Sequence, residues 1–158
     1  MFKTIKLKKY LDIVEEYIAN TTITPGMLVQ LHTDGKLKPH ATAAGPCLPM
    51  FALEDELQGK GIDDNYANLD PVQVWVPTRG DIVYALLKDN ENIAIGDFLV
   101  SDGAGSLQKY SAAVDLDSAG DGNVQRGIIV AQALEAINLS SSSGTYPETG
   151  FRIQVRIM

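Results

Sequence analysis

Cysteine and histidine are scarce in this chain of 158 residues, which contains one cysteine, Cys47, and two histidines, His32 and His40. A single cysteine cannot form an intrachain disulfide, a CxxC motif or a cysteine-rich zinc site. A nucleophile also needs a base, and only the two histidines could supply an imidazole. We therefore interpret Cys47 as a small core residue rather than a nucleophile, and we expect no enzymatic activity.

Long apolar runs and an excess of basic charge are also absent. No apolar run approaches the roughly 20 residues that cross a bilayer, and the N-terminus lacks the apolar core of a signal peptide. We therefore expect a soluble protein without a membrane partner. The formal net charge of −7 argues against nucleic-acid binding, which usually requires a basic surplus. The basic residues are unevenly placed, because four of the thirteen are lysines within the first nine positions: Lys3, Lys6, Lys8 and Lys9.

Glycine is plentiful, and three glycines lie close together in residues 93–109, IAIGDFLVSDGAGSLQK. These glycines could form a phosphate-binding loop or a tight turn between two strands. Residues 23–39, ITPGMLVQLHTDGKLKP, repeat the pattern without the extra glycines. The residues after Gly105 also lack the Lys-Ser/Thr of a P-loop and the third glycine of a dinucleotide fingerprint. Both stretches therefore predict a β-hairpin with an Asp-Gly turn, and we expect no nucleotide or other cofactor.

The similarity between the two halves of the chain extends beyond the hairpins. FALE at residues 51–54 follows the first hairpin, and QALE at residues 132–135 follows the second. We interpret this similarity as an internal duplication of a hairpin and a return strand, spanning about residues 21–60 and 91–137.

The remaining pattern is mainly that of β-strands. Alternating or continuous apolar residues predict further strands at residues 72–76, 82–87, 128–130 and 151–157. Two segments rich in Asp, Gly and Ser, at residues 114–123 and 139–150, are interpreted as loops. We expect a mainly β protein, with a compact β-barrel or β-tulip-like domain over residues 21–158.

Residues 1–20 are expected to form a basic, amphipathic arm in front of this domain. Residues 9–18 place apolar side chains at helical spacing, with Glu15 and Glu16 on the opposite face. The apolar side chains are those of Leu11, Val14, Tyr17 and Ile18. This spacing predicts a short helix, and a further helical turn is expected at residues 52–57.

Several polar residues are candidates for a metal site. His32 and His40 flank the first Asp-Gly turn and could bind a metal together with Asp34, but no further ligand is visible in the sequence. We prefer to interpret both histidines as solvated, and we expect no metal. Acidic residues also cluster at 54–56, 63–64 and 115–121. The last cluster lacks the closing Glu of an EF-hand, so we interpret it as a solvated loop, with weak calcium binding as the alternative.

Two further motifs allow more than one interpretation. Arg79-Gly80-Asp81 spells an adhesion tripeptide, but Gly-Asp is also common in turns, and we interpret it as a turn. In the strand predicted at residues 72–76, alternation places Trp75 and Val74 on opposite faces. One of these faces is expected to lie outside the core, and an exposed Trp75 would mark a subunit contact.

The runs ITPGMLVQL, DGKLKPHA and FALEDEL, followed by VQVWVPTRGDIVYALL and IGDFLVSDGAGSL, resemble the head decoration (cement) proteins of tailed bacteriophages. The resemblance covers most of residues 20–158. It implies a β-rich fold, homotrimers on the outer capsid surface of the virion, the major capsid protein as partner, and a terminal arm that grips the shell. It also implies synthesis in the host cytoplasm, and it brings no catalytic residues and no cofactor.

The expected function is therefore that of a structural virion protein that binds an assembled phage capsid and stabilises it. The expected capsid contact consists of Lys3, Lys6, Lys8, Lys9, Leu11 and Val14. The lysines would supply long-range attraction and the apolar side chains contact area, unless the latter pack on the protein's own body. The alternative function is a small-molecule or carbohydrate-binding β-barrel module, with a pocket lined by Trp75 and tyrosines.

Overall fold

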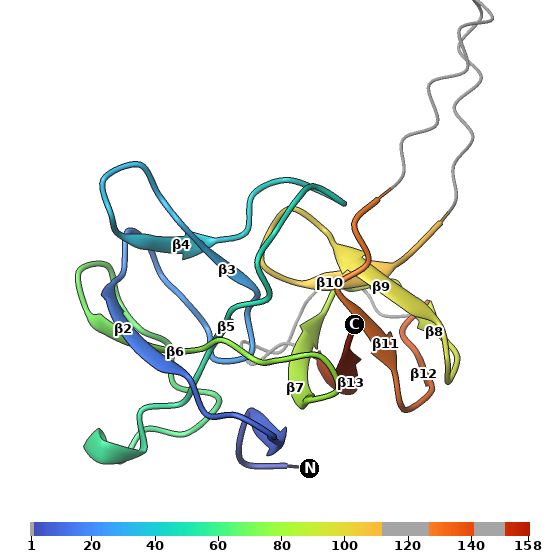
Figure 1. Cartoon of the computed structure of the whole chain (residues 1–158), viewed down its shortest axis with the longest axis horizontal. Coiled ribbons are helices and arrows are strands. Elements are labelled where there is room, and N and C mark those ends of the chain that lie inside the picture. The colour runs from blue at the N-terminus through green and yellow to red at the C-terminus, as the bar shows by residue number, and fades with distance from the viewer. Residues whose placement is uncertain (1, 112–126, 141–150) are drawn as a thin grey trace, which may run out of the picture.

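The computed structural model describes residues 2–111, 127–140 and 151–158, and these residues form a mainly β protein. Figure 1 shows two lobes side by side, the first built from β2 to β6 and the second from β7 to β13. The strands are β1 (Lys6–Lys8), β2 (Val14–Ile18), β3 (Val29–Leu31), β4 (Leu37–Pro39), β5 (Phe51–Ala52), β6 (Pro71–Trp75), β7 (Ile82–Leu87), β8 (Asn92–Ile93), β9 (Phe98–Ser101), β10 (Leu107–Lys109), β11 (Ala131–Ala133), β12 (Ile137–Asn138) and β13 (Phe151–Ile157).

The second lobe is a closed five-stranded β-barrel. Its strands follow the order β7-β10-β9-β11-β13, and β13 pairs with β7 to close the barrel. The parallel contact between β7 and β10 joins Leu87 to Leu107, whereas the other pairs are antiparallel. The short strands β8 and β12 form a separate antiparallel pair. Inward side chains such as Val83, Leu99 and Ile153 are buried in the barrel.

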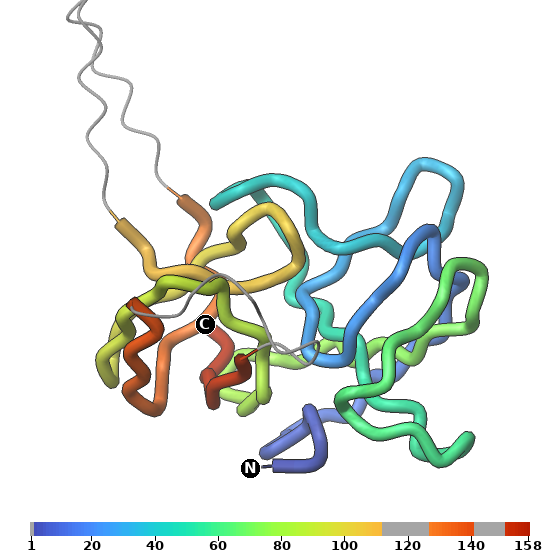
Figure 2. The backbone as a smooth tube through the Cα atoms, turned by 180° about the vertical axis from the view of Figure 1, so that it is seen from behind, coloured from blue at the N-terminus to red at the C-terminus, as the bar shows by residue number. Residues whose placement is uncertain are grey.

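The first lobe repeats this arrangement with looser pairing. Strand β2 pairs with β6, β6 with β5, and β3 with β4. Two isolated β-bridges close this lobe into a barrel. Leu28, just before β3, pairs with Phe51 of β5, and Ala19, just after β2, forms a parallel bridge with Leu37 of β4. Its core contains Ala19, Val72 and Val74. The tube in Figure 2 shows both lobes from behind, with the first lobe curling back on itself as the second does.

The predicted hairpins are confirmed. Strands β3 and β4 pair across the Asp34-Gly35 turn, and β9 and β10 pair across residues 102–106. Gly35, Gly103 and Gly105 have φ angles of 79°, 85° and 89°, which glycine adopts without steric cost. In the second turn the Asp102 carboxylate accepts hydrogen bonds from two backbone N–H groups of the same turn. The glycines therefore shape the turn backbone.

Corresponding turns before the two hairpins make the same hydrogen bonds. In the first lobe, Gly26 N–H donates to Ala52 C=O (2.8 Å) and Ala52 N–H donates to Met27 C=O (3.0 Å). In the second lobe, Gly96 N–H donates to Ala133 C=O and Ala133 N–H donates to Asp97 C=O, both at 2.9 Å. Gly26 and Gly96 also share a φ angle, 91° and 90°. Residues 24–28 are called the first turn below, and residues 94–98 the second turn.

The correspondence extends to the strands that flank these turns. Leu53 N–H donates to Gln73 C=O on β6, as Leu134 N–H donates to Gln154 C=O on β13. Strand β2 then corresponds to β7, because Glu16 lies opposite Gln73 while Tyr84 lies opposite Gln154. The shared geometry thus includes more of the chain than the hairpin and return strand that the sequence pattern indicated.

Part of the predicted secondary structure is wrong. The helix expected at residues 9–18 is absent, and Val14–Ile18 form strand β2 instead. Tyr17 packs against the first-lobe core and Ala19 lies in it, so the side chains alternate as a strand requires, and pairing with β6 fixes this choice. The turn expected at residues 52–57 is the 3₁₀ helix η1 (Glu56–Gln58), preceded by β5.

The predicted strands at 72–76, 82–87 and 151–157 are confirmed with shifts of at most one residue, as β6, β7 and β13. The strand expected at 128–130 begins only at Ala131, in β11. The loop predicted at residues 114–123, and the predicted loop after Ser140, lie outside the described residues. Within the described part of the chain, no helix is long and apolar enough to span a membrane.

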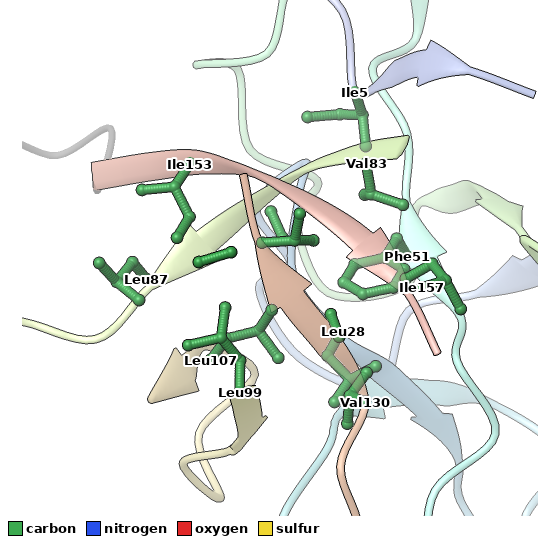
Figure 3. Packing of buried hydrophobic residues seen from close by; sticks show 14 of the residues in the cluster. Ile5, Leu28, Phe51, Val83, Leu87, Leu99, Leu107, Val130, Ile153 and Ile157 are labelled. Atoms are coloured by element: carbon green, nitrogen blue, oxygen red, sulfur yellow. The ribbon is translucent and has the colours of Figure 1, made fainter. Parts of the chain in front are cut away.

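The two lobes share one apolar cluster. Figure 3 shows Leu28 and Phe51 of the first lobe in the same cluster as Val130 and Ile157 of the second. The cluster also contains Trp75, whose side chain is fully buried. A face of the first lobe is therefore covered by the second lobe, and the two barrels are fixed to one another by packing.

Candidate functional site

The N-terminal segment is part of the body of the protein rather than a free arm. Ile5 is fully buried, its N–H donates to the Glu54 carboxylate (3.1 Å), and its C=O accepts from Tyr84 N–H (2.8 Å). Strand β1 continues this contact by pairing with β7, with Lys6 opposite Val83. These contacts fix the backbone from which the predicted lysines extend.

The four lysines fall into two groups. Lys6 and Lys9 both bind the Asp12 carboxylate, Lys6 at 3.2 Å. Hydrogen bonds from Lys9 and then Lys6 hold the pKa of Asp12 below its usual value. Lys3 and Lys8 are exposed and form no ion pair with another described residue, although the Lys8 ammonium lies 5.4 Å from the centre of the Tyr10 ring. Lys3 and Lys8 are therefore the members with charge available to a partner.

The predicted apolar contact residues are exposed. Leu11 is 57% exposed and Val14 is 43% exposed. Other large apolar side chains beside them are also exposed, namely those of Tyr10, Ile13 and Ile18. The alternative that this stripe packs on the protein's own body holds only for the half-buried Tyr17. We call the exposed side chains of residues 3–14 the N-terminal face.

Asp81 anchors this face, a role that the sequence did not indicate. The Arg79-Gly80-Asp81 motif is a turn, as predicted, with Gly80 at a φ of 97°. The fully buried Asp81 carboxylate accepts hydrogen bonds from the N–H groups of Tyr10 and Thr78, both at 2.7 Å. A buried carboxylate with these backbone partners is a structural group and is not available to an adhesion receptor.

The two histidines do not form a shared site. His32 Nδ1 lies 2.8 Å from Asp34 Oδ1 on the exposed hairpin. His40 is buried, which corrects the interpretation that both histidines are solvated. Its Nε2 lies 3.1 Å from Pro46 C=O and its Nδ1 2.7 Å from Ser101 Oγ. Within the described ranges, no three His, Cys, Asp or Glu side chains are grouped to hold a metal ion.

The acidic clusters that the structure describes are occupied by structural contacts. Glu54 accepts from Ile5 N–H, and Asp55 caps η1 by accepting from Gln58 N–H (3.3 Å). Asp64 accepts from Gly61 N–H (2.7 Å). The acidic cluster at 115–121 lies outside the described residues.

Arg152 is a second structural residue that sequence reasoning missed. It extends from β13 of the second lobe and is 6% exposed. Its guanidinium donates to Pro25 C=O (3.0 and 3.2 Å), to Ile62 C=O, and to the Asp63 carboxylate at 3.0 Å. All three acceptors belong to the first lobe, so Arg152 joins the two barrels.

Trp75, the central residue of the ligand pocket proposed from the sequence, is not accessible to a ligand. Trp75, which was expected on a half-exposed strand, is fully buried because the second lobe covers its side of β6. One hollow of about 780 Å³ is lined by residues that include Glu91, Gln108, Lys109 and Tyr110, and Trp75 is not among them. Cys47 packs against the core, and burial raises the pKa of its thiol, in agreement with a core residue rather than a nucleophile.

The chain is thus a protein of two tandem β-barrels with an exposed, basic and apolar N-terminal face. It is similar to a solved structure described as the crystal structure of head fiber gp8.5 N base in bacteriophage phi29. The TM-score is 0.54 and the identity 11%, and the match covers 94% of this chain and 95% of that chain. At this identity the likeness is one of fold. No family profile and no curated protein matches the chain.

Proposed function

We propose that the chain is a structural protein of a phage virion that binds the outer surface of the assembled capsid and stabilises it. The observation that carries this proposal is the fold, which is shared with a phage head fiber base over 94% of this chain and 95% of that chain. A protein that binds only the assembled shell stabilises that shell by mass action, without any catalytic step. The partner is the major capsid protein.

The N-terminal face is the proposed capsid contact. Lys3 and Lys8 have charges that no described carboxylate pairs, and Leu11 and Val14 offer apolar area beside them. Exposed apolar side chains grouped on one face are typical of an interaction surface. The lysines increase the rate of encounter with an acidic shell, and the apolar side chains contribute most to the lifetime of the complex.

Point substitutions test this contact better than deletion of residues 1–20, because that deletion would remove the buried Ile5 and Ala19. The assay is co-sedimentation with empty capsids of the phage that encodes the chain. The charge reversals Lys3→Glu and Lys8→Glu together should weaken binding by about tenfold at low salt and less at high salt, since salt screens exposed charges.

The matched control reverses two lysines away from the N-terminal face, Lys36→Glu and Lys88→Glu, and should leave binding within about twofold. If both double variants bind alike, or if the wild-type protein does not sediment with capsids, the proposal is wrong.

A further inference from the structure

We propose that a second copy of this chain docks its second turn, residues 94–98, on the outer edge of strand β2, and so repeats between molecules the contact that joins the two barrels within one. The proposed contact lies between copies of the chain and does not depend on a capsid.

Within one molecule, the first turn lies on the outer edge of β7. Gly26 C=O accepts a hydrogen bond from Leu86 N–H at 3.0 Å. The backbones approach so closely that a Cβ on Gly26 would lie 3.1 Å from Tyr84 C=O. Residues 24–26 of this turn are buried, and Leu86 is only 4% exposed. The first turn and the β7 edge thus form one half of a repeating interface.

The same turn in the second lobe is uncovered. Ala94, Ile95 and Gly96 are all exposed, Ile95 to 70%, although the backbone has the shape of the first turn. A Cβ on Gly96 would meet only the end of the Gln132 side chain, at 4.0 Å. Phe98, which corresponds to the fully buried Leu28, is 39% exposed. The second turn therefore presents exposed apolar side chains, together with a glycine whose neighbour is the Gln132 side chain alone among the described residues.

The edge of β2 that faces away from β6 is uncovered as well. Ile18 lies opposite Pro71 on β6 as Leu86 lies opposite Arg152 on β13, so Ile18 takes the place of Leu86. Ile18 is 43% exposed, and its N–H donates to no other described residue. A strand edge with free N–H groups is a template for backbone pairing. Gly96 C=O already accepts from the Gln132 side-chain amide (3.2 Å), and the second lone pair of this carbonyl can accept from the Ile18 N–H of another copy as Gly26 C=O accepts from Leu86.

One feature of the internal contact is missing from the proposed one. Ile95 corresponds to Pro25, whose carbonyl accepts from the Arg152 guanidinium in the internal contact. In the first lobe Pro71 occupies the position of Arg152, so the Ile95 carbonyl of another copy would find no guanidinium donor there. The contact between copies is therefore apolar, with Ile95 and Phe98 against Ile18 and Pro71. Lacking a buried charge, it is weaker than the internal contact and reversible.

The geometry of this contact is head-to-tail. Each copy offers one turn and one edge, and because the two surfaces differ, assembly gives a closed ring or, if the rotation does not close, an open filament. A ring of three copies would correspond to the homotrimer that the resemblance to decoration proteins implies.

Sedimentation of the purified protein over a range of concentrations tests the proposal. The wild-type chain should assemble beyond the monomer, and either Ile95→Glu or Ile18→Glu should raise the dissociation constant at least about tenfold, because a charge would enter an apolar contact. Ile18→Thr, which keeps a β-branched side chain on the strand, should act in the same direction. The control Leu57→Glu, at a position that is 88% exposed on η1, should have no effect.

Crosslinking tests the pairing of the two surfaces directly. In a Cys47→Ser background, chains with Ile95→Cys and chains with Ile18→Cys are mixed and treated with a short thiol crosslinker. The mixture should give a crosslinked dimer, and either variant alone should not. A wild-type protein that stays monomeric at all concentrations, assembly that both glutamate variants leave intact, or crosslinking of one variant alone as readily as the mixture would overturn the proposal.

Discussion

Replacing Arg152 by methionine should lower the free energy of unfolding by about 3 kcal/mol. The guanidinium of Arg152 is the polar link between the two barrels, with hydrogen bonds to the carbonyls of Pro25 and Ile62 and to the Asp63 carboxylate. Methionine has a similar length and can fill most of the same space, so the substitution removes the donors without opening a large cavity.

The magnitude follows from the exposure of each partner. Removing one member of a buried ion pair typically costs 3 to 5 kcal/mol, roughly, because the remaining group is left unpaired. The Asp63 side chain is 42% exposed and returns to water, whereas the two carbonyls lose donors in a buried setting. The expected loss is therefore at the lower end, about 3 kcal/mol, or roughly 6 to 12 °C in Tm for a chain of this size.

Urea unfolding of matched variants measures this effect. Arg156→Met is the control, because Arg156 lies on the same strand with an exposed side chain and should cost within about 0.5 kcal/mol. Arg152→Lys should lower the free energy of unfolding by an intermediate amount, since lysine keeps the charge but lacks the planar guanidinium that reaches several acceptors. If Arg152→Met and Arg156→Met unfold at the same urea concentration, Arg152 does not join the barrels energetically.

Three further predictions concern other contacts. His40→Ala should lower the free energy of unfolding by about 1 to 3 kcal/mol, measured by urea titration, because the fully buried Ser101 hydroxyl loses its hydrogen bond to the imidazole. The pKa of Asp97 is lowered by a hydrogen bond from Lys109 and then by one from the backbone of the second turn. The Asp97 carboxylate therefore contributes to the stability of the fold above pH about 4, and this contribution is lost as the pH falls through the folded-state pKa. An NMR titration should place that pKa below 3.8, and Lys109→Ala should raise it; an unchanged value would contradict the assignment. Gly26→Ala should destabilise more than Gly96→Ala in thermal melts, because both strain a positive φ but only Gly26 has a backbone carbonyl 3.1 Å from the new Cβ.

Features set by neighbouring residues could be predicted from the sequence. The Asp-Gly turns form where the sequence places them, because a tight turn depends on the φ angles of a few adjacent residues. Strand β13 was predicted within one residue, since strict alternation over residues 151–157 fits only a strand. Leu11 and Val14 are exposed, as their assignment to the capsid contact required, although that assignment started from a helical spacing that the structure does not show.

Features set by distant segments could not be predicted. The spacing of Leu11, Val14, Tyr17 and Ile18 fits a helix, but β6 pairs with residues 14–18 and makes them a strand. Trp75 looked half-exposed, because the sequence of β6 does not reveal that the second lobe covers it. Arg152 meets Pro25 and Asp63 only after both barrels have formed. Tertiary pairing decides such cases against local preference.

The two barrels provide an internal reference for each other's surfaces. Where the two backbones agree, corresponding residues have the same local structure. A difference in their exposed fractions is then caused by whether another part of the protein covers them. Leu86 and Ile18 are such a pair, at 4% and 43% exposed, and Leu28 and Phe98 are another, at 0% and 39%. An apolar side chain that loses its cover would be expected to be replaced by a polar one if water were its permanent neighbour. Ile18 and Phe98 remain large and apolar, which favours a partner molecule over water at both positions.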